Sequence, residues 1–473
     1  MEKRSDICRA ERLAQLGKAM QRIERGPQTP PPKIQRVDNH LRQNPDFAKY
    51  FLPRLLSIGP IHHGKENLKL GEQYKLIWTA MHLKENKQDP DDLCLRIEEI
   101  IEEVKGLYTE DAIRDYNDNT LVWMLFVDGC SVLQIMEKFD SLHPEELWIK
   151  PDQQEHVIRD LHLLENQIPY KILQILSKDE ATLVSSMLNL EFGGLVKNDM
   201  FHEVVPQFSG CESWAKIFER LSLEDPQGKP KPNHLLDFLR LMFLKIDHGI
   251  LQNRRMQETQ IQINDDPKHN KEVPHLLWPT YKNIRELKAA GIRVERKETL
   301  CLSYVSFVSK WFSGVLKLPG FYVDESSPYV YLNMIAYEKC PDFHNNFEIC
   351  SYLSFLDTLI DDANDVKELR LAGVIQNLLG SDEELAKLLN GVGTELASKG
   401  SYLLSTSKMT HSKKYTQVKY QIEKHCRNKW KTWMAQAYNT YFSNPWSICA
   451  FLAALLALVL TIIQTWMAIH PNN

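Results

Sequence analysis

Three aspartates spaced four residues apart come closest, of all the polar residues in this chain, to the pattern of a catalytic metal site. Asp357, Asp361 and Asp365 are each separated by about one helical turn, and the last five residues of this stretch read DDxxD. Carboxylates at this spacing share one face of a helix and could hold Mg²⁺ together with a diphosphate. The pattern favours a membrane-bound, Mg-dependent enzyme acting on a phosphorylated lipid or isoprenoid.

The apolar residues between these aspartates favour a simpler interpretation. Leu353, Leu356, Leu359 and Ile360 would form the buried side of the same helix, which leaves the aspartates on its solvated side. Isoprenoid enzymes of the all-α class also carry a second metal motif well downstream, and none follows here. We therefore interpret the three aspartates as a solvated face and keep the enzyme as the alternative.

Two adjacent histidines occupy a compact turn between Ile58 and Gly64. On an extended segment, the side chains of His62 and His63 point in opposite directions and cannot easily share a metal ion. Glycine and proline explain the backbone of this turn without any ligand. We predict a structural turn here and no metal site.

A dense polar group, Glu165, Asn166 and Gln167, stands just before Ile168 and Pro169. Proline removes a helical hydrogen bond, so a helix is expected to end or kink at Ile168 and to restart at Pro169. The three polar side chains can then bond the backbone groups that the break leaves free. We predict a structural motif at these residues in place of a catalytic carboxylate–amide site.

Other recognisable chemistry is absent from the sequence. There is no P-loop, GxGxxG, GxSxG or HExxH motif and no identifiable Cys/His dyad, so we predict no catalytic residue, metal ligand, cofactor or small-molecule substrate. The formal net charge of −5 over 473 residues argues against nucleic acid as a partner, since phosphate binding needs a concentrated basic surface. Nine scattered cysteines indicate free thiols in a reducing compartment.

The C-terminal segment from Ser447 to Trp466 contains 20 residues and no charge. A helix of this length spans about 30 Å, the thickness of the hydrocarbon core of a bilayer. Trp446 and Trp466 bracket it and are predicted to anchor it at the two membrane interfaces, where amphipathic rings are favoured. The predicted partner of residues 447–466 is therefore a lipid bilayer.

Flanking charge predicts the orientation of this span. Seven lysines and arginines lie between residues 413 and 431, whereas only His470 follows the span. The positive-inside rule then keeps the preceding body in the cytosol and translocates the tail from Met467 to Asn473. We expect a single-pass membrane protein, with the plasma membrane as a candidate location.

Most of the remaining sequence has helical periodicity, including an apolar stripe from Leu93 to Val104 and a strongly apolar run from Leu121 to Met136. Alternating residues and turn signals between about residues 291 and 324 predict a small antiparallel sheet. The expected fold is mainly α-helical, with this β element and one C-terminal transmembrane helix. The expected regions are a charged N-terminal helix and Pro-rich linker over 1–36, a mostly helical globular body over 37–441, and the anchor with its short tail over 442–473.

Taken together, several segments resemble the plant family called domain of unknown function 247, also known as UPF0481. The resemblance covers nearly the whole chain, from about Val37 to Trp466. It rests on the order and combined specificity of SIGPIHHGKENL (Ser57–Leu68), WMLFVDGC (Trp123–Cys130), DLHLLENQIPYKIL (Asp160–Leu173), HLLDFLR (His234–Arg240), LKLPGFYVDESSPYVYLNMIAYEKC (Leu316–Cys340), SFLDTLIDDANDVKELRLAGVI (Ser354–Ile375) and NPWSICAFLAALLALVLTIIQT (Asn444–Thr465). The chain departs from the family at Ser131, where an aromatic residue usually follows the cysteine.

The resemblance implies a plant protein with a single C-terminal membrane span, and it implies no catalytic activity. Some grass members of the family are associated with gametophytic self-incompatibility, as candidate pollen-side recognition determinants. We therefore expect a membrane-anchored protein that acts by protein–protein recognition or signalling, with self/non-self recognition as one candidate context. Its partner would be another protein.

Overall fold

The computed structural model describes most of the chain outside its N-terminal region. The described residues are 13, 16, 17, 20, 33–138, 144–197, 232–245, 283–297, 299, 301–310, 313–343, 347–398, 413–428, 430 and 445–469. Most of the N-terminal helix and the Pro-rich linker expected over 1–36 lies outside these residues.

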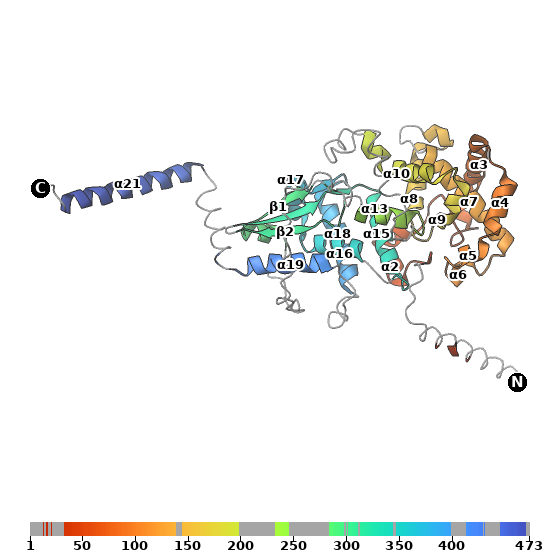
Figure 1. Cartoon of the computed structure of the whole chain (residues 1–473), viewed down its shortest axis with the longest axis horizontal. Helices are drawn as coiled ribbons and strands as arrows, with labels where there is room; N and C mark the ends of the chain where they lie inside the picture. The colour runs from red at the N-terminus through yellow and green to blue at the C-terminus, as the bar shows by residue number, and fades with distance from the viewer. Residues whose placement is uncertain are drawn as a thin grey trace.

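The described chain is mainly helical, as expected. Helices from the first half of the chain gather at one end of the body, and two small sheets with later helices form the other end (Figure 1). The helices of the first half are α2 (Asn39–Gln43), η1 (Ala48–Phe51), η2 (Glu66–Leu68), α3 (Lys69–Asn86), α4 (Pro90–Glu98), α5 (Ile101–Lys105), α6 (Glu110–Ile113), α7 (Asp118–Lys138), η3 (Pro144–Leu147), α8 (Pro151–Leu161), α9 (Tyr170–Leu176) and α10 (Glu180–Lys197). Those of the second half are α13 (Leu235–Lys245), α14 (Ile284–Ala289), α15 (Ser327–Glu338), α16 (Glu348–Asp357), α17 (Ala363–Leu371), α18 (Asp382–Ser398), α19 (Lys413–Cys426) and α21 (Pro445–Ile469).

Helix α7 is the centre of the first half. Helices α3, α4, α9 and α10 all pack against it, and its residues from Met124 to Met136 are buried without a break. Its apolar character on every side is explained by this surround, because a helix covered on all faces needs no polar face. The apolar stripe from Leu93 to Val104 is divided between two short helices, α4 and α5, and contributes to the same core.

The small β element expected over residues 291–324 is present, but it is mixed and not antiparallel. Strand β3 (Gly314–Pro319) is central; it pairs in parallel with β1 (Ile292–Lys297) and antiparallel with β2 (Ser306–Ser309). A second sheet pairs β4 (Phe321–Val323) in parallel with β5 (Ile375–Asn377). The antiparallel prediction was wrong for β1 because a period of two shows which residues share a face and carries no information on strand direction.

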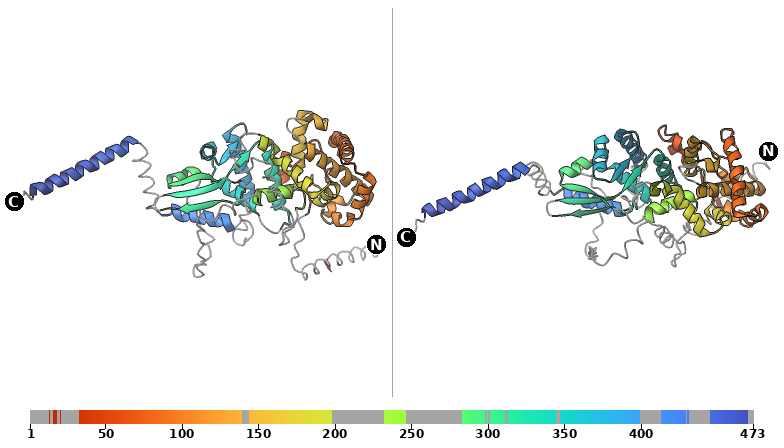
Figure 2. Two further views of the ribbon diagram at one scale, coloured as in Figure 1. Left: turned by 45° about the horizontal axis from the view of Figure 1, so that its top comes forward. Right: turned by 90° about the horizontal axis from the view of Figure 1, so that it is seen from above.

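The described residues of the body form two hydrophobic cores. The first core is centred on α7 and contains most of the buried apolar residues between Leu55 and Leu190. The second core is built from the sheets and α14 to α19, together with Val37, Leu41, Phe47 and Phe51 from the N-terminal part of the body. Helix α13 serves both, and lies between them (Figures 1 and 2). Its residues Leu235, Phe238 and Met242 belong to the first core, whereas Leu236, Leu239 and Leu244 belong to the second.

Helix α21 differs from every other long helix in its exposure. It is apolar and long enough to cross a membrane over Cys449–Ile469, and none of that window is buried in the structure. Helix α7 meets the same requirements of length and composition, yet 83% of its most apolar 18-residue window is buried inside the first core. Figures 1 and 2 show α21 standing apart from the body. The burial of α7 explains its composition without a membrane, and no such explanation holds for α21.

Candidate functional site

The polar group at residues 165–167 lies between the two cores. Helix α8 ends at Leu161, earlier than the sequence predicts, and α9 begins at Tyr170 with Pro169 as its N-cap residue. The break is therefore an eight-residue buried segment, not a kink at Ile168. Leu164 in this segment belongs to the second core, and Ile168 belongs to the first. The chain thus crosses to the second core at Leu164 and returns to the first at Ile168.

Two amides bond the backbone groups that this crossing leaves free. Gln167 Nε2 donates to the carbonyls of Leu161 and Leu163 at 2.7 and 2.9 Å, and its Oε1 accepts from the N–H of Leu236 on α13 at 3.1 Å. Gln167 is 2% exposed, so water does not reach these backbone groups. The Gln167 amide therefore supplies the hydrogen-bond partners that the buried groups need. Its amide thus joins the crossing segment to the helix shared by both cores.

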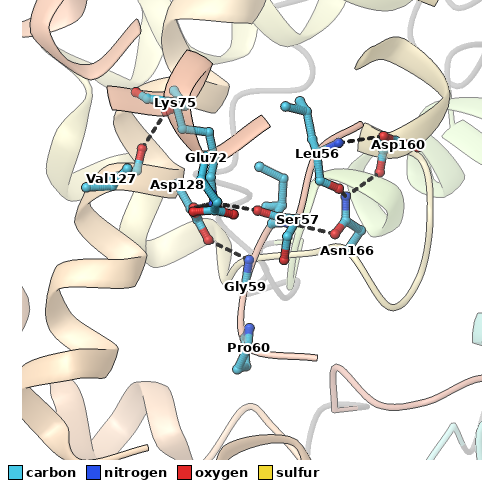
Figure 3. Close-up of polar contacts among 12 residues, drawn as sticks. Leu56, Ser57, Gly59, Pro60, Glu72, Lys75, Val127, Asp128, Asp160 and Asn166 are labelled. Carbon is cyan, nitrogen blue, oxygen red and sulfur yellow. Dashed lines mark hydrogen bonds and ion pairs between the residues drawn. The ribbon is translucent and has the colours of Figure 1, made fainter. Parts of the chain in front are cut away.

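Asn166 connects the same segment to an earlier stretch of chain. Its Oδ1 accepts from the N–H of Ile58 at 2.7 Å, and its Nδ2 donates to the carbonyls of Leu56 and Asp160 at 3.2 and 2.9 Å (Figure 3). The Asp160 carboxylate lies beside it and accepts three backbone N–H bonds, at 2.7 to 2.9 Å, from residues 54, 55 and 56. Burial raises the pKa of Asp160 to about 6 although these three donors favour its charged form.

Glu165 is fully buried and contacts groups from the N-terminal part of the body. Its Oε1 accepts from the N–H of Val37 at 2.7 Å, and its Oε2 lies 3.2 Å from Arg42 Nη2 and 3.0 Å from His62 Nε2. Burial lowers the pKa of His62 despite the adjacent carboxylate, so a neutral ring is favoured at neutral pH. The other ring nitrogen of His62 lies 2.6 Å from Lys65 Nζ.

A buried ion pair completes the network. Lys75 Nζ on α3 lies 2.5 Å from Asp128 Oδ1 on α7, and it also donates to the carbonyl of Ser57 at 2.6 Å. The second oxygen of Asp128 accepts from the N–H of Gly59 at 2.7 Å (Figure 3). Burial raises the pKa of Asp128 against the effect of Lys75. The pair therefore joins two helices of the first core to the chain at residues 57–59.

The hydrogen bonds of this network hold parts of the chain together. Its carboxylates and amides bond backbone groups near residues 37, 54–59, 160–163 and 236. Its members Asp128, Asp160, Asn166 and Gln167 are buried. A buried polar group that meets several fixed donors is held in one geometry and is costly to remove. The arrangement fixes how the first core, the second core and the N-terminal part of the body fit together.

Two glycines of the predicted histidine turn provide a matched test of this fit. Gly59 and Gly64 both have positive φ, at 73° and 78°. A Cβ at Gly59 would lie 2.6 Å from the carbonyl oxygen of Gln167, whereas one at Gly64 would meet nothing within 4 Å. Both alanine substitutions carry the left-handed backbone cost of about 1–2 kcal/mol, and only Gly59→Ala adds a clash with backbone.

We therefore expect Gly59→Ala to lower the free energy of unfolding by about 2 kcal/mol more than Gly64→Ala. Denaturant unfolding of the two full-length variants in detergent measures the difference. Equal losses would mean that the approach of residues 59 and 167 tolerates an extra methyl group.

The three aspartates predicted to share a helical face, Asp357, Asp361 and Asp365, do not do so. Helix α16 ends at Asp357 and α17 begins at Ala363, so the expected single helix is wrong. Asp365 is fully buried; its carboxylate accepts from Arg285 Nε at 2.8 Å and from the N–H of Asp361 at 2.9 Å. It is thus not on a solvated face, because it closes the N-terminal end of α17 in a capping box.

The other two aspartates have separate surroundings. Asp361 Oδ2 accepts from Asn283 Nδ2 at 2.9 Å. Asp357 is half-buried against Gly393 of α18, and burial raises its pKa to about 6 although Lys419 opposes the shift. Within the described residues, no group of three or more His, Cys, Asp and Glu side chains is arranged to hold one metal ion.

Comparison with known proteins assigns the chain to a family. Residues 34–460 match DUF247, described as a plant protein of unknown function. The chain belongs to this plant family. The UPF0481 protein At3g47200 of Arabidopsis thaliana is 25% identical to it, with 89% of this chain and 83% of that protein covered. The putative UPF0481 protein At3g02645 of the same plant is 24% identical, with 89% and 88% covered. No solved structure matches the chain.

The DUF247 match spans both cores and most of α21, which ends at Ile469. At Ser131 of α7, the hydroxyl donates to the carbonyl of Lys75 on α3 at 2.9 Å. A small polar residue fits this close contact. In α21, Trp446 lies in the first turn, and its side chain is outside the described set; the Trp466 side chain is 65% exposed near the other end.

The sequence did not reveal Lys75, Asp128 or Asp160 as members of the network. Asp128 carried a usable signal, because it is the only charged residue between Leu121 and Met136. A carboxylate placed inside a buried apolar helix needs a partner. The identity of that partner had no sequence signal, since Lys75 lies 53 positions away on another helix.

Proposed function

We propose that this protein is a single-pass membrane protein whose cytosolic body acts by binding another protein. The observation that carries the proposal is the exposed apolar helix α21, with no part of Cys449–Ile469 buried. Leaving so many large apolar side chains in water is unfavourable, and a bilayer removes them from it. The buried polar groups of the body bond its own backbone. This arrangement supports a protein that binds a partner through its surface over one that catalyses a reaction.

The proposed orientation rests on charge. Seven basic residues lie between residues 413 and 431, and residues 467–473 contain none. Lysine and arginine next to a short C-terminal span oppose translocation, so the body stays in the cytosol and the tail crosses the membrane. The plasma membrane is the candidate location.

A membrane-bound Mg-dependent enzyme acting through Asp357, Asp361 and Asp365 is the second candidate function. Its support is the DDxxD spacing. The geometry favours it less, because the Asp365 carboxylate is already engaged by Arg285 and by backbone N–H groups of the turn before α17. Mg²⁺ titration of the full chain separates the candidates: saturable binding abolished by Asp361→Asn would favour the enzyme.

Self/non-self recognition is one context for the binding proposal. A cytosolic body would then meet its partner only after that partner has entered the cell, or would act through an intracellular relay. A receptor displayed on the cell surface would need the opposite orientation. The orientation test below therefore also decides between these two forms of recognition.

The orientation is tested with epitope tags at both ends of the full chain in plant protoplasts. We expect protease added to intact cells to remove the C-terminal tag and to leave the body whole. After the cells are opened, the body should be degraded as well, which controls for intrinsic protease resistance. Degradation of the body in intact cells would overturn the proposed orientation.

The partner is sought by proximity labelling with a ligase fused to the N-terminus. The matched control fuses the same ligase to residues 442–473 alone, which share the membrane but lack the body. We expect a set of proteins labelled by the full chain and not by the anchor. Identical labelled sets would contradict recognition by the body.

A further inference from the structure

Helix α19 is the last described helix before the membrane anchor, and its orientation on the body is fixed. It packs against β2 and α16. Tyr415, Val418 and Ile422 face inward and are buried in the second core. The Tyr415 hydroxyl donates to the carbonyl of Leu302 at 2.7 Å, which fixes the inward face further. The opposite face of α19 is therefore held outward.

That outward face is positively charged. Lys414 and Lys424 are exposed and take part in no ion pair among the described residues. Arg427, just beyond the helix, is exposed, and the one carboxylate of α19, Glu423, is buried and lies 2.5 Å from its guanidinium. Lys419 is half-buried. Glu423 thus offsets the charge of Arg427, and α19 has no other carboxylate to offset Lys414 and Lys424.

Two carboxylates of neighbouring elements lie close to α19. Asp357 of α16 interacts electrostatically with Lys419, and the exposed Glu286 of α14 lies close to Cys426 at the C-terminal end of α19. The charge is also unusual for the chain: residues 413–473 hold seven basic residues and one acidic residue, whereas the preceding 412 hold 50 and 61. The segment that adjoins the anchor therefore has a net positive charge, whereas the rest of the chain has a net negative one.

The connection to α21 limits how far this face can lie from the membrane. Residues 431–444 separate Trp430 from the start of α21 at Pro445. Fourteen residues span at most about 50 Å when fully extended. In Figure 1, α19 and β2 lie at the end of the body from which the chain continues to α21. The exposed side chain of Trp430 follows directly after the basic face.

We propose that the exposed face of α19, formed by Lys414, Lys424 and Arg427, lies against the anionic headgroups of the membrane in which α21 is anchored. This inference rests on the membrane anchor proposed above and adds a second, electrostatic contact. Attraction to an anionic surface acts within a Debye length of about 8 Å at physiological salt, so the face must touch the membrane. Because α21 tethers the body to the membrane, the effective concentration of the α19 face at the membrane surface is high. A few charges are therefore enough for the face to bind there. Docking then presents the opposite side of the body to the cytosol.

The test uses the full chain reconstituted into vesicles, with the photoreactive residue p-benzoylphenylalanine replacing exposed Gln417 on the same face. Neutral vesicles contain phosphatidylcholine alone, and anionic vesicles contain about one-third phosphatidylserine. We expect crosslinking to lipid to be at least about fivefold greater in the anionic vesicles and to fall with added salt. The double variant Lys414→Glu, Lys424→Glu should lose this difference.

A matched control reverses two exposed lysines elsewhere, Lys84→Glu and Lys178→Glu, which changes the net charge by the same amount. Retained crosslinking in this control supports the proposal. Equal crosslinking in both lipids, or equal loss in both double variants, would overturn it. Co-flotation with vesicles after carbonate washing tests the α21 anchor separately. If the chain does not float with the vesicles, the proposed membrane anchor is contradicted, and the docking proposal that depends on it is contradicted for that reason.

Discussion

Replacing Lys75 by methionine is expected to lower the free energy of unfolding by about 3–5 kcal/mol, because it leaves the carboxylate of Asp128 buried without its partner. Methionine keeps the volume of the side chain inside the first core, so the loss reports on charge and not on a cavity. The carbonyl of Ser57 also loses its donor. Denaturant unfolding of the full chain in detergent measures the change, which would be a large part of the stability of a typical domain.

The matched control lies on the same helix. Lys69 of α3 is paired with Glu66 at 2.6 Å, and both side chains are mostly exposed. Lys69→Met should therefore change the free energy of unfolding by less than about 1 kcal/mol. Adding Asp128→Asn to Lys75→Met should recover part of the loss, because the amide is uncharged and still accepts from Gly59. Similar losses for Lys75→Met and Lys69→Met would show that the buried pair contributes no more than a surface one.

The Lys75→Met variant should also depend on pH in a defined direction. Burial already raises the pKa of Asp128 above its unfolded value, and removal of the cation raises it further. A carboxyl group whose pKa is higher in the folded than in the unfolded state stabilises the folded protein at a pH below its unfolded pKa. This contribution to the free energy of unfolding is lost as the pH rises through the folded pKa. The destabilisation of Lys75→Met relative to the natural chain should thus be smaller near pH 4 than near pH 8.

Deleting residues 447–473 is expected to convert the protein from one that resists alkaline carbonate extraction into one that is released completely. The reason is that α21 is exposed and uncharged, whereas the only other described helix of suitable length and composition, α7, is buried in the first core. Fractionation of plant membranes before and after a carbonate wash, followed by immunoblotting of the body, measures the distribution.

A shorter deletion provides the control for this experiment. Removal of residues 470–473 leaves α21 whole, so this variant should stay in the membrane fraction. If the long deletion remains carbonate-resistant, another part of the chain is anchored in the membrane. The single-span topology would then be wrong.

The two longest apolar helices could be predicted from the sequence, and so could their difference. Helix α7 contains Asp128 within its apolar run, and α21 has no charge over 20 residues. One buried charge can be compensated inside a protein core by a partner on a neighbouring helix, but an apolar run without any charge is typical of a membrane span. The mainly helical class follows from the same periodicity.

Strand direction and helix ends were harder to predict. The alternation of residues in β1 and β3 fits parallel and antiparallel pairing equally well. The structure shows a parallel register in which Ile292 pairs with Gly314, and this pairing leaves no signal in the sequence. The spacing of Asp361 and Asp365 suggested one helix, although the chain breaks between α16 and α17. Asp362 and Asp365 form a capping box, and an aspartate followed three residues later by another acidic residue was the available signal for a helix start.

The polar network was only partly visible for a physical reason. Glu165, Asn166 and Gln167 are adjacent in sequence and precede a proline, so a broken helix was predictable. Their partners come from residues 37–62 and from α13, and these contacts depend on the tertiary fold. The local sequence shows which polar groups need a hydrogen-bond partner. It does not show which distant residue provides that partner.

The double role of α13 limits how the chain can be divided. A fragment ending before α13 would lack Leu235, Phe238 and Met242 from the first core, and a fragment beginning after it would lack Leu236 and Leu239 from the second. A gene truncated anywhere in its middle therefore encodes no half that retains a complete interior. Alleles that stop early should behave as complete losses of the protein, and heritable variation compatible with folding should be concentrated on the outer surfaces of the two ends.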